Sequence, residues 1–382
     1  MHIAIDYTAA VWQGAGIGRY TRELVAAIVA KAPDLRYTLF YASGGLSSNS
    51  PFVAELQRLC GSYPTVKAVG IPLPPRRLVQ LWHRLRLPLP LELFTGRIDL
   101  LHQPDFALPP ARARSLVTVH DLSYMVHPEC AVPGVARYLN SAVPRSIRRA
   151  EHILSDSHAT RNDMLRLLGV PGEKVSVVYP GVSPRFRPLA PEATADARRR
   201  LGLPERLLLF VGTLEPRKNL PGLIEALAML RDRGRLPEEM PLIIGGKRGW
   251  MYQPIFDAIS RHRMEPHVRL IDYIDDADLP IVYNLAWAFV YPSIYEGFGL
   301  PALEALACGT PVVTADNSSL PEVVGDIALR VPADDVAALA AALEQVIGDE
   351  ALRARLRAEG PQRAALFTWE QAAEHVLAHY RH

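Results

Sequence analysis

Residues 291–314 read YPSIYEGFGLPALEALACGTPVVT, and this stretch decides the fold that we predict for the chain. Its first residues continue an apolar run, which predicts a buried strand, and a glycine-containing turn follows. Pro301 suits the first position of a helix, Gly309 suits its end, and the apolar residues after it predict the next strand. This order of strand, loop, helix and strand is typical of a parallel sheet covered by helices.

Two carboxylates flank the start of the predicted helix. In a parallel sheet this helix N-terminus lies at the carboxyl edge, where free N–H groups and the helix dipole favour a phosphate. Glu296 lies before the helix and Glu304 about one turn inside it, so we expect both to face one crevice. A carboxylate accepts two hydroxyl hydrogen bonds, which suits a sugar. Two glutamates alone would more often be ordinary exposed residues.

The whole string resembles the signature of the retaining glycosyltransferases of family 4, which have the GT-B fold. Glu296 and Glu304 are separated by seven residues that include Gly-Phe-Gly-Leu-Pro, and Ala-Cys-Gly-Thr-Pro-Val-Val follows. The resemblance implies that Glu296 contacts the donor sugar and that Glu304 contacts the nucleotide ribose. It also implies that intervening backbone amides hold the donor diphosphate, at Gly297, Phe298, Gly299 and Leu300.

Length and composition predict two globular α/β domains. The chain has 382 residues, of which 49% are apolar, enough for two cores. The resemblance implies two Rossmann-like doubly wound domains that face each other across a cleft. We expect an acceptor-side domain at 1–183, a nucleotide-sugar domain at 184–364, and a last helix at 365–382 that crosses back to the first domain. Residues 138–150 predict a helix that is broken or kinked at Pro144.

Charge and cysteine content limit the partners and the compartment. The formal net charge of +2 is too small to favour a nucleic-acid partner. The three cysteines, Cys60, Cys130 and Cys308, are widely spaced, which fits a reducing cytoplasm rather than a disulfide framework. No apolar run reaches the length of a membrane span, and the first residues do not form a secretory signal. We therefore expect a cytoplasmic protein.

A glycine loop at 13–18 follows the first predicted strand. Arg19 occupies the last glycine position of a nicotinamide-binding fingerprint, so a tight turn explains the loop as well as a ligand does. The string GIGRYTREL is similar to the family loop that lies against the donor diphosphate and the acceptor. The resemblance therefore makes Gly16 and Gly18 candidate site residues.

Two histidines end predicted strands in the first half. Strand carboxyl ends are where open α/β sheets place ligands, although a single histidine is more often structural. The segment around His120, VTVHDLS, resembles the family segment whose histidine faces the donor sugar. We therefore select His120 and keep His102 as the second choice. Asp121 would either orient the His120 imidazole or cap the next turn.

Residues 72–94 combine four arginines with an apolar pattern and contain no acid before Glu92. Such a stretch can lie on an anionic membrane surface or bind an acidic acceptor. A solvated helix with its apolar face on the core is an equally good interpretation.

In the second half, Arg217 and Lys218 follow a predicted strand and precede a helix. Adjacent cations beside a helix start suit a diphosphate, although an Arg-Lys pair is commonly just solvated. The resemblance assigns this motif, which begins at Gly212, to the donor phosphates. It places Tyr273 and Ile274 beside the nucleotide base.

The acidic cluster at 275–278 has the spacing of a metal-diphosphate site. We interpret it instead as a helix cap, with Asp275 at the N-cap and Asp278 three residues later. No metal ion or other cofactor is therefore expected.

The resemblance implies a retaining, metal-independent hexosyltransferase. The expected partners are a nucleotide sugar and a glycan or lipid-linked acceptor, with cell-surface polysaccharide as the product. Strings such as HDLSY and DNSSLPE look most like the bacterial GDP-mannose-dependent mannosyltransferases of the family. A transferase that uses a UDP- or dTDP-sugar, a sugar-nucleotide epimerase of the same fold, and a binding protein without turnover are the alternatives. The expected catalytic residues are His120, Arg217, Lys218 and Glu296.

Overall fold

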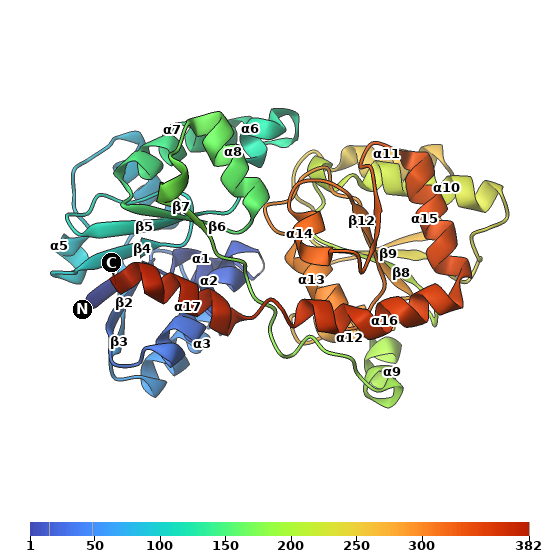
Figure 1. Cartoon of the computed structure of the whole chain (residues 1–382), viewed down its shortest axis with the longest axis horizontal. Coiled ribbons are helices and arrows are strands. Elements are labelled where there is room, and N and C mark those ends of the chain that lie inside the picture. The colour runs from blue at the N-terminus through green and yellow to red at the C-terminus, as the bar shows by residue number, and fades with distance from the viewer. Residues whose placement is uncertain (15, 48, 382) are drawn as a thin grey trace. The chain divides into compact units, whose positions relative to one another are not determined.

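The chain forms two compact units, shown in the computed structural model of Figure 1, which describes residues 1–14, 16–47 and 49–381. The first unit comprises residues 1–126, 133–181 and 368–382, and the second comprises 127–132 and 182–367. The chain thus passes between the units at 181–182 and 367–368, two or three residues from the boundaries expected from the sequence. The short segment 127–132 also belongs to the second unit.

The first unit is built on a seven-stranded sheet in which every pair of neighbours is parallel. The strand order is β3-β2-β1-β4-β5-β6-β7. The order reverses beside β1, as in doubly wound folds, whose ligands bind at the carboxyl edge near such a switch point. The strands are β1 (His2–Asp6), β2 (Arg36–Ala42), β3 (Val66–Ile71), β4 (Leu100–Gln103), β5 (Arg114–Val119), β6 (His152–Ser155) and β7 (Val175–Val177).

The last helix of the chain belongs to the first unit. Helix α17 (Trp369–Arg381) packs on α2 (Ile17–Lys31), and Trp369 and Tyr380 are buried in the same core as Tyr20 (Figure 1). The predicted return of this helix is therefore confirmed. The other helices of the unit are α1 (Thr8–Trp12), α3 (Pro51–Ser62), α4 (Pro75–Leu78), the π-helix η1 (Val79–Arg84), α5 (Glu92–Thr95), α6 (Ser123–Val126), α7 (Pro133–Arg149), α8 (His158–Leu168) and the 3₁₀ turn η3 (Gly172–Lys174).

Two helix predictions in this unit need correction. The sequence predicted a break or a kink at Pro144, but helix α7 begins at Pro133 and continues through this proline, so the break is wrong. Residues 72–94 do not form one amphipathic helix but the short elements α4, η1 and α5. Across the described residues, no helix combines the length and the apolar character needed to span a membrane.

The second unit repeats the architecture with six parallel strands in the order β10-β9-β8-β11-β12-β13. Its strands are β8 (Leu208–Val211), β9 (Leu242–Gly245), β10 (Val268–Ile271), β11 (Ala288–Tyr291), β12 (Val312–Ala315) and β13 (Leu329–Val331). Its helices are the 3₁₀ turns η2 (Pro128–Cys130) and η4 (Pro216–Lys218), with α9 (Pro191–Arg200), α10 (Leu220–Asp232), α11 (Gln253–Arg261), α12 (Leu279–Leu285), α13 (Leu300–Ala307), α14 (Leu320–Val324), α15 (Val336–Gly348) and α16 (Glu350–Ala364).

The stretch 291–314 folds as predicted, as the end of β11, the helix α13 and the strand β12. Gly299 is the N-cap of α13 and has a φ of 106°, which a residue with a side chain rarely adopts. A Cβ atom there would also lie 2.8 Å from the side chain of Leu320. Glycine is therefore required for the turn between the strand and the helix.

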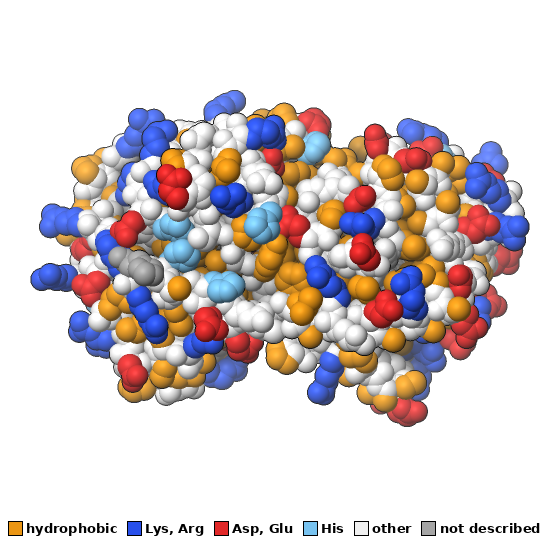
Figure 2. Space-filling view, viewed as in Figure 1, with side chains coloured by type: hydrophobic (Ala, Val, Ile, Leu, Met, Phe, Trp, Pro, Cys, Tyr) orange, Lys and Arg blue, Asp and Glu red, His pale blue; other side chains and the backbone are white. Residues whose placement is uncertain are grey.

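The predicted fold class, two doubly wound parallel α/β domains, is confirmed in both units. On the face shown in Figure 2, acidic and basic side chains are interspersed, which agrees with the formal net charge of +2.

Candidate active site

A buried ion network lies at the carboxyl ends of β8 and β11 in the second unit. Glu296 accepts a hydrogen bond from Lys218 Nζ at 2.5 Å with one carboxylate oxygen, and from Arg217 at 2.8 Å with the other. Arg217 also donates to Glu215 at 2.7 Å, and Lys218 donates to the hydroxyl of Tyr291 at 2.8 Å. The structure thus brings together three of the four predicted catalytic residues.

The charges of this network hold Glu296 ionised. Burial raises the pKa of Glu296, but Arg217 and Lys218 outweigh burial and lower that pKa to about 2. Burial and the Arg217 charge lower the pKa of Lys218, against the opposite effect of Glu296 and Glu215. The cations are therefore fixed in place by carboxylates before any ligand arrives.

Two serines hold the loop that carries Glu296. The Ser318 hydroxyl accepts from the backbone N–H of Glu296 at 3.0 Å. The Ser319 hydroxyl donates to the carbonyls of Glu296 and Phe298, at 2.9 Å and 2.8 Å. Because both serines follow β12, they fix the Gly297–Leu300 turn against the neighbouring strand end. The sequence showed this segment only as a loop.

Glu304 lies in α13 and is buried, so it is not the ordinary exposed residue that an isolated glutamate would be. Its carboxylate accepts a hydrogen bond from the hydroxyl of the fully buried Tyr283 at 3.0 Å. A buried carboxylate on the first turns of a helix requires polar partners. Its contact with a ribose stays a prediction.

The predicted base-side residues lie around the ends of β9 and β10. Tyr273 is exposed, and the Lys247 ammonium lies 4.7 Å from the centre of its ring. Ile274 packs so closely on Gly245 that a Cβ atom there would be 2.4 Å from the Ile274 side chain. The turn at Gly212 is equally tight, because a Cβ atom on Gly246 would lie 1.9 Å from the Gly212 carbonyl.

The proposed cap at 275–278 is wrong in its details. Asp278, not Asp275, is the N-cap of α12, and its side chain makes no capping hydrogen bond. It instead pairs with Arg200 at 2.9 Å, and this hydrogen bond lowers the pKa of Asp278. Within the described part of the chain, no cluster of three or more His, Cys, Asp or Glu side chains has the arrangement of a metal site.

In the first unit, His120 is buried after β5 and both of its ring nitrogens are occupied. Nδ1 lies 2.7 Å from an Asp156 carboxylate oxygen, and Nε2 lies 2.9 Å from the Pro104 carbonyl. Burial lowers the pKa of His120, but the charge and hydrogen bond of Asp156, helped by Asp105, raise it to about 9. His120 is therefore an imidazolium that donates from both nitrogens.

Asp156 was not predicted as a site residue. The sequence offered Asp121 as the partner of His120, but Asp121 accepts from the backbone N–H of Ser123 at 2.8 Å and so caps the next turn. Asp156 directly follows β6, which is the neighbour of β5, so it lies at the same sheet edge as His120. This position after a predicted strand could have indicated Asp156 as a site residue. Asp105, which follows β4, lies at this edge too, and burial raises its pKa to about 6.

His102, the second choice, has a structural partner. It is completely buried in β4, and its Nδ1 lies 2.7 Å from the hydroxyl of Tyr380 in α17. Burial lowers the pKa of His102 to about 3, so the ring is neutral. This contact joins the last helix to the first sheet.

In the loop before α2, the backbone structure explains why both candidate positions are glycine. Gly16 is the N-cap of α2 with a φ of 58°, and a Cβ atom on Gly18 would lie 2.2 Å from the Gln13 carbonyl. Arg22 donates to the Gln13 carbonyl at 2.8 Å and to the Gly14 carbonyl at 3.0 Å. Ala15 of this loop is outside the described residues. Contact of the loop with a donor stays a prediction.

Comparison with known proteins identifies the family. Residues 14–186 match the family described as glycosyltransferase family 4, and residues 193–363 match glycosyl transferases group 1. O-antigen chain mannosyltransferase B of Escherichia coli is 32% identical over 381 residues, which cover 96% of each chain. The chain belongs to this glycosyltransferase family. The family predicted from residues 291–314 is confirmed.

Solved structures show the same fold for this glycosyltransferase. Sucrose-phosphate synthase of Thermosynechococcus elongatus has a TM-score of 0.77 and 22% identity over 100% of this chain and 98% of its own. HepE of Anabaena, solved in complex with UDP and glucose, has a TM-score of 0.76 and 19% identity over 100% and 99% of the two chains. The predicted GT-B fold is therefore confirmed.

Proposed function

We propose that this glycosyltransferase transfers mannose from GDP-mannose, with retention of anomeric configuration, to a glycan or lipid-linked acceptor in surface polysaccharide synthesis. The observation that carries the transfer mechanism is the buried network of Arg217, Lys218 and Glu296. The mannosyl donor is supported by the name of the E. coli relative, an O-antigen mannosyltransferase. HepE was solved with UDP, so the shared fold does not select the base.

The network fits the charge that develops during transfer. As the bond between the anomeric carbon and the diphosphate breaks, negative charge grows on the diphosphate oxygens. Arg217 and Lys218 are already oriented by Glu215 and Glu296, so they stabilise this charge without reorganising. A nearby diphosphate also favours the charged form of Lys218, whose pKa is lowered in its absence. These two cations supply the role that a divalent ion has in metal-dependent transferases.

Glu296 acts on the sugar in this proposal, through hydrogen bonds to its hydroxyls. The acceptor oxygen attacks the anomeric carbon on the face from which the diphosphate leaves, and its proton passes to the departing phosphate oxygen. No covalent bond to the protein forms. His120, held charged by Asp156, contributes a positive charge at the carboxyl edge of the first sheet.

We also propose that the enzyme works at the cytoplasmic face of a membrane, with residues 72–94 in peripheral contact with the surface. The support is the exposure of Arg76, Arg77, Arg84 and Arg86, which anionic lipids would attract.

A donor panel tests the proposed function. The protein would be incubated with GDP-mannose, UDP-glucose or a dTDP-hexose and a soluble mannose-containing oligosaccharide, with and without a chelator. We expect transfer from GDP-mannose, unaffected by the chelator, and an anomeric configuration by NMR that matches the donor. Preference for a UDP- or dTDP-sugar would contradict the proposed donor. Loss of activity with the chelator would contradict metal independence, and an inverted product would contradict retention. Conversion of the donor without acceptor would indicate an epimerase.

A further inference from the structure

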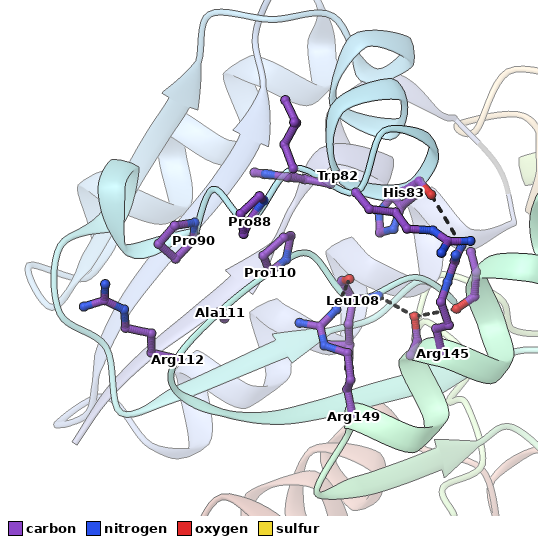
Figure 3. Close-up of a pocket in the computed structure, with 14 residues that line it drawn as sticks. Trp82, His83, Pro88, Pro90, Leu108, Pro110, Ala111, Arg112, Arg145 and Arg149 are labelled. Carbon is purple, nitrogen blue, oxygen red and sulfur yellow. Dashed lines mark hydrogen bonds between the residues drawn. The ribbon is translucent and has the colours of Figure 1, made fainter.

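The first unit contains a pocket that the proposed transfer reaction does not use. It has a volume of about 440 Å³ and lies between the segment 82–90, the segment 108–112 and the C-terminal half of α7 (Figure 3). These segments lead away from the carboxyl edge that holds His120, because 108–112 runs back to the start of β5. The pocket is therefore not part of the His120 site.

The pocket is lined by four arginines and by no acidic side chain. Arg86, Arg112, Arg145 and Arg149 contribute to the wall. Within the described residues, none of the four forms an ion pair with a carboxylate. Glu92 is adjacent in the fold, but one of its carboxylate oxygens accepts from the backbone N–H groups of Arg112 and Ala113. The Glu92 carboxylate therefore lies near the pocket but pairs with none of its four guanidiniums.

Neighbouring groups respond to this charge. Burial, together with Arg86 and Arg148, lowers the pKa of Arg145. Burial, with the charges of Arg145 and Arg149, lowers the pKa of His83 to about 4. His83 is therefore neutral near pH 7, and the arginines alone set the charge of the pocket.

Two of the arginines are held in place by backbone carbonyls. Arg149 donates to the carbonyls of Leu108 and Pro109, at 3.2 Å and 2.8 Å, and Arg145 donates to that of His83 at 3.3 Å. Figure 3 shows their side chains rising from α7 toward the segments that carry these carbonyls. Since a guanidinium has five N–H groups, these bonds orient the cations and leave donors for a ligand.

Apart from His83 and Ser146, the rest of the wall is apolar, and exposed apolar side chains occur in and directly after the segment 82–90. Trp82 and Leu108 are buried in the wall, with Pro88, Pro90 and Pro110 along the same side in Figure 3. Large apolar side chains are exposed at Leu85, Leu87 and Leu89 in this segment, of which Leu87 also lines the pocket, and at Leu93 and Phe94 in α5. A cluster of exposed apolar residues marks a surface that contacts lipid or a partner.

We propose that this pocket binds the diphosphate group of a lipid carrier whose hydrocarbon chain lies over the apolar residues 85–94. Several guanidiniums that pair with no carboxylate fit a diphosphate, which carries two or more negative charges, better than a phospholipid diester, which carries one. The apolar residues beside the pocket provide contact for the chain next to the charged group. The inference deepens the proposed function, on which it rests, because the carrier would present the acceptor glycan to the enzyme.

Binding of farnesyl diphosphate, a water-soluble lipid diphosphate, tests the proposal in the absence of donor and acceptor. Titration calorimetry would compare the wild type with Arg86→Gln/Arg145→Gln. Among the described residues, the single hydrogen bond of these two side chains is that from Arg145 to the His83 carbonyl at 3.3 Å. We therefore expect the variant to fold, as circular dichroism would check. Arg148→Gln is the matched control, because Arg148 is exposed on the same helix but does not line the pocket.

We expect the double substitution to weaken farnesyl diphosphate binding at least about tenfold, equivalent to about 1.4 kcal/mol, and the control to leave it unchanged. Unchanged binding in the double variant, or equal weakening in the control, would overturn the site. Inorganic pyrophosphate binding as tightly as farnesyl diphosphate would overturn the role of the chain. Binding to phosphatidylglycerol vesicles without any response to farnesyl diphosphate would indicate a phospholipid surface instead. Because transfer to a soluble oligosaccharide does not need this pocket, the donor panel tests the proposed function separately.

Discussion

Replacement of Lys218 by methionine separates the stabilising role of the ion network from its proposed catalytic role. Methionine is close to lysine in length but has no charge, so the buried site keeps its volume. Lys218 is only 6% exposed and contacts Glu296 at 2.5 Å. The variant therefore leaves Glu296 with Arg217 as its one remaining cation.

The stability cost follows from the pKa of Glu296. The difference between 4.5 and about 2 corresponds to roughly 3 kcal/mol of net stabilisation of the carboxylate, at about 1.36 kcal/mol per pKa unit. Two cations share this effect, so loss of one should lower the free energy of unfolding by about 1–3 kcal/mol. Because the pKa of Glu296 is depressed, its contribution is present above pH 4.5 and is lost as the pH falls toward 2. In Lys218→Met the folded-state pKa of Glu296 should lie closer to 4.5, so this loss should be smaller and should be complete at a higher pH.

The loss of turnover in Lys218→Met is expected to be larger than its loss of stability and independent of it. Removal of one preorganised group that stabilises transition-state charge commonly lowers kcat by about 100- to 1000-fold. The assay is transfer from the preferred donor to a soluble oligosaccharide, with urea unfolding measured on the same samples. Turnover of a folded Lys218→Met variant within a few fold of the wild type would refute the role of Lys218.

A double variant, Lys218→Met/Glu296→Gln, completes the comparison. Neutralising Glu296 removes a buried carboxylate that has lost one of its two cations, so part of the lost stability should return. Activity should not return, because the cation and the sugar contact are both absent. Recovery of activity together with stability would show that the network only maintains the fold.

Three further predictions follow from other contacts. Glu304→Gln keeps an acceptor for Tyr283 but removes the charge, so nucleoside-diphosphate affinity should fall by about 1 kcal/mol, and unchanged calorimetry would reject the ribose contact. Ser319→Ala should lower the free energy of unfolding by about 1 kcal/mol and raise KM for the donor more than it lowers kcat, since the Gly297–Leu300 turn loses its clamp. The pKa of His120 is raised from 6.5 to about 9, so its stabilising effect is present below pH 6.5 and is lost as the pH rises through 9. Asp156→Asn should remove this alkaline loss in urea unfolding, and an unchanged pH profile would contradict the pairing.

The parts of the fold that depend on local signals were predictable. The turn before α13 is specified by Gly299, the start of the helix by Pro301, and the strands by apolar runs, all within one short stretch. Arg217, Lys218 and Glu296 were selected by resemblance, and the structure places them in direct contact. Their hydrogen bonds could not be derived from sequence, because 78 positions separate Lys218 from Glu296.

The wrong predictions concern positions where contacts with residues distant in the sequence outweigh the local sequence pattern. The sequence predicted Asp275 as the N-cap of α12, but Asp278 occupies that position, and its carboxylate pairs with Arg200 of α9 instead of capping the helix. Pro144 removes a backbone donor from α7, yet the flanking residues Val143 and Ile147 are buried, and their packing outweighs the loss of one hydrogen bond. Local propensity is weaker than tertiary contact in both cases.

Asp156 and the arginine pocket show how much of a site depends on strand order rather than on spacing. Asp156 reaches His120 because β5 and β6 are neighbours, so two residues 36 positions apart occupy the same sheet edge. The pocket likewise combines Arg86 with Arg112 and with two arginines of α7, of which only Arg86 lay in the stretch that the sequence marked as basic. Whether an arginine pairs with a carboxylate depends on the whole neighbourhood, since an acidic side chain on any of these segments could form an ion pair with it. A basic stretch therefore becomes a candidate anion site only when the fold shows which side chains face it.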